Sequence, residues 1–141
     1  MIKDNLLLLK TAITAVTSTE SGWTTESRDP TTGQKVIQVN KCPLGGIPIE
    51  VIAAADTGTS NDKTMVVTIE ASDTLGSSYI VVATFPTITY ADVSAVRLVR
   101  NIATQKKYLR SVITVSGSNG TISRLFEIAV GIGQVDDDAG F

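Results

Sequence analysis

The stretch Lys107 to Gly133, KYLRSVITVSGSNGTISRLFEIAVGIG, decides the fold class of this chain. Apolar residues recur at every second position on both sides of a glycine-containing centre, and this period of two is typical of half-buried β-strands. The centre is Gly117-Ser118-Asn119-Gly120. Asn119 and Gly120 can both adopt positive φ, which a type I′ hairpin turn requires. We therefore predict two long strands joined by a tight turn as a β-hairpin.

The alternation also assigns residues to the two faces of each strand. In the first strand, one face is predicted to hold Leu109, Ser111, Ile113 and Val115. In the second strand, one face is predicted to hold the even-numbered residues Ile122, Arg124, Phe126, Ile128, Val130 and Ile132. Each strand is therefore expected to bury one face and to expose the other.

Further stretches upstream read as strands and are separated by turns rich in Gly, Pro, Asp and Ser. They cover residues 36–39, 47–54, 64–71, 79–85 and 96–102. Pro48 cannot donate a ladder hydrogen bond, so its strand is expected at a sheet edge or is expected to begin after Pro48. Strands at this spacing predict an all-β fold, an antiparallel β-sandwich of jelly-roll type with seven or eight strands.

Residues 1–34 differ from the rest and are interpreted as an extended N-terminal arm. Leu6 to Leu9 is an unbroken apolar run that we expect to form a short strand, and a Thr- and Ser-rich stretch follows it. The alternative is a helix from Asp4 to Val16, because apolar residues of this region fit a helical stripe. The many β-branched residues are weak helix formers and favour the strand. The domain plan is an arm at 1–34, a sandwich at 35–135 and a flexible acidic tail at 136–141.

Size and charge exclude several classes of partner. A chain of 141 residues is most simply one domain, long enough to bury a core without disulfides. The net charge of −2 gives no reason to expect nucleic acid as a partner. No stretch approaches the ~20 apolar residues of a membrane span. The opening residues lack a convincing signal-peptide cleavage site, so we do not expect secretion.

Few residues of this sequence suit catalysis or metal binding. It contains no histidine, which removes the common catalytic triads and the commonest metal ligand. Cys42 is the only cysteine and is expected to act as a small buried hydrophobe. Glu50, Glu70 and Glu127 alternate with apolar residues, as outward-facing strand positions should, which disfavours a catalytic carboxylate pair.

Asp136 to Asp138 could bind a cation such as calcium, but they lack the spacing of a known calcium loop and are expected to belong to a solvated tail. We therefore predict that the protein is not an enzyme. We expect no catalytic residue, metal site, cofactor or small-molecule substrate.

Two features are candidates for a protein interface. The first is a run of basic residues without an intervening acid, predicted either to be solvated or to contact an acidic protein surface: Arg97, Arg100, Lys106, Lys107 and Arg110. The second consists of apolar residues of the arm, which suit strand addition to a neighbour: Leu6, Leu7, Leu8 and Leu9. Trp23, also in the arm, is predicted either to cap the edge of the core from a loop or to anchor a protein interface, where tryptophan is enriched.

Several of these strands, in order, resemble a known family. IPIEVIAAAD at 47–56, MVVTIEASD at 65–73, YIVVATF at 79–85 and KKYLRSVITVSGSNGTISRLFEIAVG at 106–131 are similar to the small capsid decoration, or cement, proteins of tailed bacteriophages. The similarity spans roughly residues 36 to 135. Its most diagnostic part is Tyr108-Leu109-Arg110, followed by Val115, Gly117 and a second strand. The Leu- and Thr-rich opening departs from the family pattern.

The resemblance implies a jelly-roll-like sandwich that forms homo-oligomers, dimers or trimers, on the outer surface of a capsid. The implied partner is an HK97-fold major capsid protein, and the implied location is the virion, after synthesis in the host cytoplasm. The family has no catalytic residue to transfer to this chain. Two other readings stay open: a carbohydrate-binding jelly roll that would use Trp23, Tyr79, Tyr90 and Tyr108, and a structural protein of the virion tail or neck.

Overall fold

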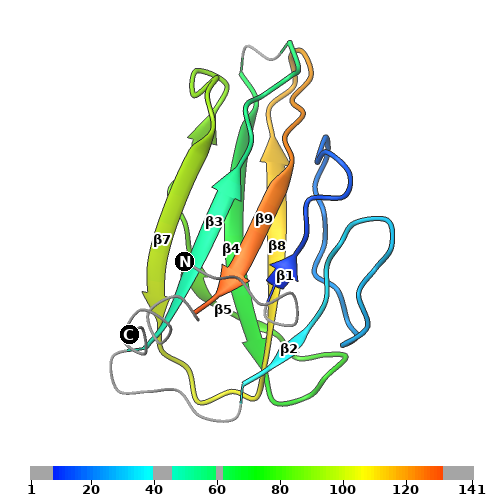
Figure 1. The fold of residues 1–141 in the computed structure, drawn as a ribbon, viewed down its shortest axis with the longest axis vertical. Helices are drawn as coiled ribbons and strands as arrows, with labels where there is room; N and C mark the ends of the chain where they lie inside the picture. The colour runs from blue at the N-terminus through cyan, green and yellow to red at the C-terminus, as the bar shows by residue number, and fades with distance from the viewer. Residues whose placement is uncertain (1–7, 40–45, 60–61, 132–141) are drawn as a thin grey trace, which may run out of the picture.

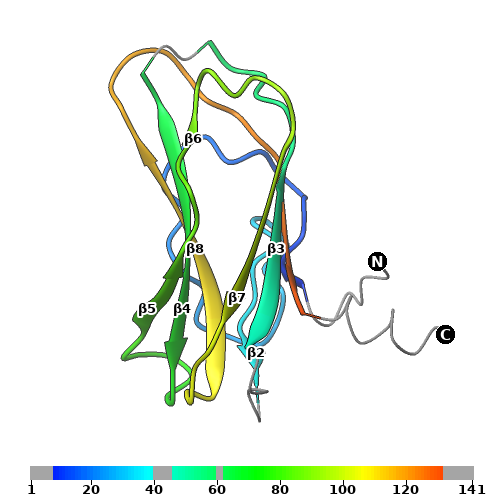
Figure 2. The ribbon, with the colours of Figure 1, turned by 90° about the vertical axis from the view of Figure 1, so that its left-hand side faces the viewer.

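A computed structural model of the chain describes residues 8–39, 46–59 and 62–131. These residues contain nine strands and no helix, and the strands form two sheets that face each other (Figures 1 and 2). The predictions for Leu6, Leu7, Cys42 and Ile132, and those for the acidic tail at 136–141, lie outside the described residues.

Both sheets are antiparallel. The first sheet has the order β1 (Leu8–Lys10), β9 (Phe126–Val130), β3 (Ile47–Ala53), β7 (Val96–Ile102). The second has the order β2 (Ile37–Gln38), β8 (Tyr108–Ser116), β4 (Thr64–Ser72), β5 (Ile80–Thr84). The short β6 (Ile88–Thr89) pairs with the beginning of β4.

The strand order is that of a jelly roll. With β6 set aside, the eight strands include four pairs nested from the outside in: β1 with β9, β2 with β8, β3 with β7, and β4 with β5. Two four-stranded sheets built from eight antiparallel strands in this way define the jelly-roll architecture. The all-β, antiparallel sandwich predicted from the sequence is therefore confirmed.

The predicted hairpin between residues 107 and 133 is wrong, although its strands exist. β8 lies in the second sheet between β2 and β4, whereas β9 lies in the first sheet between β1 and β3, so residues 117–125 cross from one sheet to the other. Gly117 and Gly120 have positive φ, but Asn119 does not. Ser78 is the only non-glycine residue with positive φ in the described chain. The carboxylate of Asp62 accepts hydrogen bonds from the Ser118 and Asn119 amides and holds this crossing loop.

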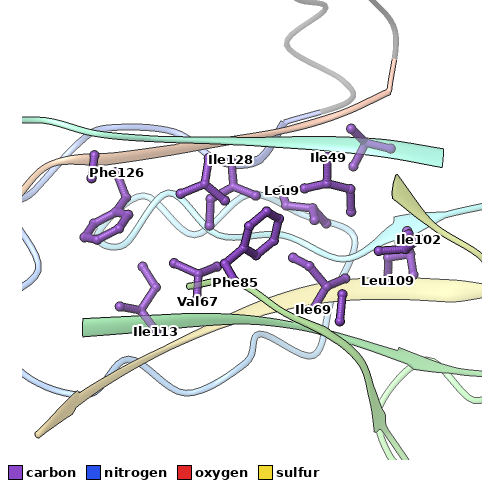
Figure 3. Packing of buried hydrophobic residues seen from close by; sticks show 14 of the residues in the cluster. Leu9, Ile49, Val67, Ile69, Phe85, Ile102, Leu109, Ile113, Phe126 and Ile128 are labelled. Carbon is purple, nitrogen blue, oxygen red and sulfur yellow. The ribbon is translucent and has the colours of Figure 1, made fainter. Parts of the chain in front are cut away.

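The predicted faces of these two strands are confirmed. Leu109, Ser111 and Ile113 of β8 are buried, and so are the even-numbered residues from Ile122 to Val130. Figure 3 shows how side chains from the two sheets meet in the core, with Phe85 and Phe126 between them. Each large apolar side chain buried in this way contributes roughly 1.5–3 kcal/mol to folding.

Pro48 lies inside a central strand, contrary to both predicted alternatives. It is the second residue of β3, which is flanked by β7 and β9, and it pairs with Asn101 of β7. Its carbonyl accepts the amide of Gly131, just past the end of β9. In an antiparallel sheet, the N–H and the C=O of one residue point toward the same neighbouring strand. The N–H that Pro48 lacks would therefore face the end of β9, and no hydrogen bond to β7 is lost.

The first described residues belong to the sandwich. Leu9 of β1 is fully buried in the core, and no helix is found between residues 8 and 16, as the favoured strand prediction requires. The chain then makes isolated bridges from Val16 to Arg124, in the crossing loop before β9, and from Glu20 to Ile113 of β8. It therefore passes from the edge of the first sheet to the edge of the second before it reaches β2 (Figure 1).

Candidate protein interface

On the side of the sandwich where β1 and β2 lie, a segment of the chain covers the strand edge. The amide of Lys35 donates to the carbonyl of Leu9, and the amide of Thr11 donates to the carbonyl of Gly33, both at 3.0 Å. Residues 11–36 thus cover the edge of β1, and we call this the closed side. Its backbone groups are already satisfied within the chain, so it offers a poor template for strand addition.

A buried polar cluster fixes the closed side. Lys10 is fully buried, and its Nζ donates to Oε2 of Glu20 at 2.8 Å and to the carbonyl of Thr32 at 2.5 Å. Nε2 of Gln34 donates to the same Glu20 oxygen at 2.5 Å. A buried ammonium is tolerated only where such partners replace water. The cluster therefore ties β1 to the segment that covers it.

On the opposite side, the strand edges of β5 and β7 lie next to each other without backbone pairing between them. We call these two edges and the loop at 90–95 the open side, and Figure 2 looks onto it. Arg100 of β7 pairs with the buried Ile49, so its side chain is on the inner face of its sheet. From there its Nη1 reaches the carbonyl of Thr84 in β5 at 2.7 Å.

Most of the exposed apolar side chains belong to the strands and the loop of the open side, although the registers place Val81 and Val99 on opposite outer faces of the sandwich. The described chain has seven large hydrophobic residues that are exposed, and five of them lie between residues 80 and 99: Ile80, Val81, Tyr90, Val93 and Val99. The other two are Ile13 and Leu125. From Tyr90 to Asn101, no residue is buried. Edge strands usually carry charges, whereas β5, Ile-Val-Val-Ala-Thr, has none. Apolar residues that are exposed along unpaired strand edges make these edges a candidate contact surface.

A buried arginine holds the loop that carries Val93. Arg124 is 1% exposed, and its Nη1 donates to the carbonyls of Ala54 at 3.0 Å and of Ser94 at 3.2 Å. Its Nη2 donates to the carbonyl of Asp92. This end of the open side is therefore fixed by contacts to the crossing loop that leads into β9.

The side chain of Asp92 fixes the same loop from its other end. Its carboxylate accepts hydrogen bonds from the backbone and side chain of Thr89, and these hold the pKa of Asp92 below its ordinary value.

The five basic residues predicted as one strip are distributed over different parts of the fold. Arg97 and Arg100 are in β7, on opposite faces of the first sheet, whereas Arg110 is in β8 of the second sheet. Arg97 pairs with Glu50. Lys106 pairs with Asp73 at 3.2 Å, and Nζ of Lys107 lies 5.6 Å from the ring centroid of Tyr108. Only Arg97 and Arg100 lie on the open side.

Arg110 is held within the second sheet. It pairs with Glu70 of β4 at 2.7 Å, and its guanidinium lies 3.9 Å from the centroid of the Tyr79 ring. This side chain therefore already has a charged and an aromatic partner on its own surface.

Two of the five apolar residues predicted for the interface are used inside the fold. Leu8 and Leu9 are buried in β1. Trp23 is half-buried, and its Nε1 donates to the carbonyl of Ser27 at 2.9 Å. Glu50 is on the outward face of β3, as predicted, but it is only 6% exposed and pairs with Arg97.

Sequence reasoning missed the exposed residues of β5. Ile80, Val81 and Val82 are consecutive apolar residues, a pattern that is typical of a strand buried on both faces. Their exposure follows from the edge position of β5, which only the strand order reveals. The one usable signal was the absence of any charge from residue 79 to residue 91.

The comparisons with known proteins give no assignment. No protein-family model matches the chain, and no curated protein matches it. Within the described ranges there is no group of three or more His, Cys, Asp or Glu residues that could hold a metal ion, and no helix long and apolar enough to cross a membrane.

Proposed function

We propose that the protein is a structural, protein-binding component of a phage virion. In this proposal it decorates the outer surface of the capsid and stabilises it by binding neighbouring major capsid protein subunits. The observation that carries the protein-binding part is the exposure of apolar residues along the unpaired edges of β5 and β7. The capsid part is supported by the resemblance of the strands between residues 36 and 135 to capsid decoration proteins.

The physical mechanism is the burial of surface across the joint between subunits. A module that binds two subunits at once adds an interface that must be broken before the subunits separate. Each well-buried apolar side chain adds roughly 1.5–3 kcal/mol to that interface, and many copies on one shell sum these contributions. The chain would be made in the host cytoplasm and would bind the capsid after assembly, as a homo-oligomer, either a dimer or a trimer.

The test is direct binding to capsids. Purified protein is mixed with expanded capsids of the virus that encodes it, and binding is measured by co-sedimentation. Thermal rupture of the capsids is then followed by the release of fluorescence from a DNA dye. We expect binding and a higher rupture temperature, with a protein of similar size and charge as the control. An absence of binding would rule out the proposal.

The carbohydrate-binding reading depends on free aromatic rings. One face of the Tyr79 ring is covered by Arg110, and Lys107 lies over Tyr108, whereas Tyr90 is exposed. A glycan array without hits would argue against this reading. A position in the tail or neck would be recognised by locating the protein in virions by electron microscopy.

A further inference from the structure

Three polar side chains meet in the interior of the closed side. Lys10 is fully buried, Gln34 is 1% exposed, and only 15% of the Glu20 side chain is exposed. Oε2 of Glu20 accepts hydrogen bonds from Nζ of Lys10 at 2.8 Å and from Nε2 of Gln34 at 2.5 Å. An amine nitrogen and a carboxamide are therefore held against one carboxylate oxygen and are shielded from water.

The backbone places Lys10 and Gln34 directly opposite each other. They form an antiparallel bridge, and the backbone hydrogen bonds that flank it come from the neighbouring residues on each side. Lys10 and Gln34 are therefore a non-hydrogen-bonded pair, in which the Cα atoms are typically about 4.5 Å apart and the side chains come closest. Because both side chains also end at the same Glu20 oxygen, Nζ of Lys10 lies next to the carboxamide of Gln34.

The hydrogen bonds of this cluster leave one of its buried atoms without a partner. Oε1 of Gln34 is buried and has no hydrogen-bond partner among the residues that the structure describes. A buried polar atom without a partner costs free energy, and a buried ammonium costs more. An amide bond between Lys10 and Gln34 would remove the buried positive charge and keep the two segments joined.

We propose that Lys10 and Gln34 react with each other once the chain has folded, so that an isopeptide bond joins β1 to the segment that precedes β2. Nζ of Lys10 bonds to Cδ of Gln34, the bond from Cδ to Nε2 breaks, and Nε2 leaves as an ammonium ion. Lys10 begins as an ammonium, and Glu20 begins and ends as a carboxylate, so atoms and charge balance. The reaction occurs once per chain and needs no external substrate, and it is independent of the proposed capsid role.

Glu20 carries the protons in this reaction. Its Oε2 takes a proton from Nζ of Lys10, which turns the ammonium into a nucleophilic amine, and the same oxygen delivers the proton to Nε2 of Gln34, the leaving group. The carbonyl of Thr32, 2.5 Å from Nζ, orients the amine. The fixed contact between the reacting groups replaces a bimolecular encounter, and burial keeps water from competing for the amide. A carboxylate is a poorer electrophile than an amide, so Gln34 and not Glu20 receives the amine.

The test is mass spectrometry of the folded wild-type protein, followed by peptide mapping. We expect an intact mass that is lower than the sequence requires by one ammonia, and a branched peptide in which Lys10 is joined to Gln34. Wild-type chains recovered from inclusion bodies and kept in urea should have the full mass and should lose ammonia on refolding. A folded wild type that keeps its full mass would overturn the proposal. Loss of ammonia that maps only to Asn119-Gly120, where a succinimide can form, would also overturn it, as would loss of water with a link from Lys10 to Glu20.

Variants separate the roles of the side chains. Lys10→Arg keeps a positive charge but has no primary amine, so it should keep the full mass. Glu20→Gln should slow bond formation during refolding by about a hundredfold or more, because the proton carrier is gone. Lys106→Arg is the matched control, because Lys106 pairs with Asp73 on the surface, and it should react like the wild type. Thermal melts check that each variant folds, and the refolding of the wild type decides the outcome if the variants do not fold. A folded Glu20→Gln variant that reacts at the wild-type rate would overturn the role assigned to Glu20.

Discussion

Replacement of Arg124 by methionine should destabilise the protein and loosen the loop at 92–94. The Arg124 side chain is 1% exposed and donates to three carbonyls from two different segments, those of Ala54, Asp92 and Ser94. Methionine keeps much of the side-chain volume, so the change removes the hydrogen bonds without opening a large cavity.

The expected magnitude follows from these contacts. A hydrogen bond from a charged donor contributes about 1.5–3 kcal/mol, so three of them represent a gross loss of roughly 4.5–9 kcal/mol. Two effects reduce this loss of stability. Asp92 and Ser94 are exposed residues, so their carbonyls can bind water in the variant. Removal of the guanidinium also removes the free-energy cost of burying its charge. We expect a net loss of about 3 kcal/mol, which for a chain of this size lowers Tm by about 10 °C.

The assay is thermal and urea unfolding of the wild type, Arg124→Met and Arg124→Lys, followed by circular dichroism. Lysine keeps the charge but can reach fewer carbonyls, so its Tm should lie between the other two. Amide hydrogen exchange of residues 92–94 should be faster in Arg124→Met. A methionine variant with a Tm within about 2 °C of the wild type would refute the reasoning about this buried cluster.

Three further predictions test the other parts of the fold. Leu9→Ala removes a fully buried side chain and should cost about 3 kcal/mol in urea unfolding, whereas a change below ~1 kcal/mol would mean that β1 is not part of the core. Gly33→Ala should destabilise the protein by at least ~1 kcal/mol, because Gly33 has a φ of +77° and a Cβ there would lie 2.4 Å from the carbonyl oxygen of Thr11. The control Gly76→Ala, with open space around it, should be nearly neutral, and equal effects of the two variants would contradict this. Hydrogen bonds from the crossing loop hold the pKa of Asp62 below its ordinary value of 3.8, so its stabilising contribution is complete above that value and is lost as the pH falls through the depressed pKa. Asp62→Asn should therefore make Tm less dependent on pH below about pH 5, and an unchanged acid dependence would count against it.

Much of the strand content could be predicted from the sequence, but the partners of the strands could not. In β8 and β9 the period of two assigned Leu109, Ile113 and Phe126 correctly to buried faces. The same period says nothing about which strand lies alongside, and a short glycine-rich link suits a hairpin as well as a crossing between sheets. The nested order of the jelly roll decides between them, and that order is a property of the whole chain.

The candidate interface shows the same limit. Arg97 and Arg100 were singled out because they are close in the sequence to other basic residues, and the fold separates them from Arg110. The open side combines β5 with β7, whose closeness depends on the arrangement of both sheets. Glu50 was correctly placed on an outward face, but its burial depends on its pairing with Arg97, which requires the register of β3 and β7.

Hydrogen–deuterium exchange of the protein, free and bound to expanded capsids, tests the central claim most directly. The claim is that the protein binds the capsid and that the exposed edge strands β5 and β7 take part in the binding. We predict slower exchange on binding at residues 80–84 and 93–101, with residues 11–36 unchanged. Slower exchange confined to residues 11–36, with the β5 and β7 amides exchanging as in the free protein, would contradict the claim.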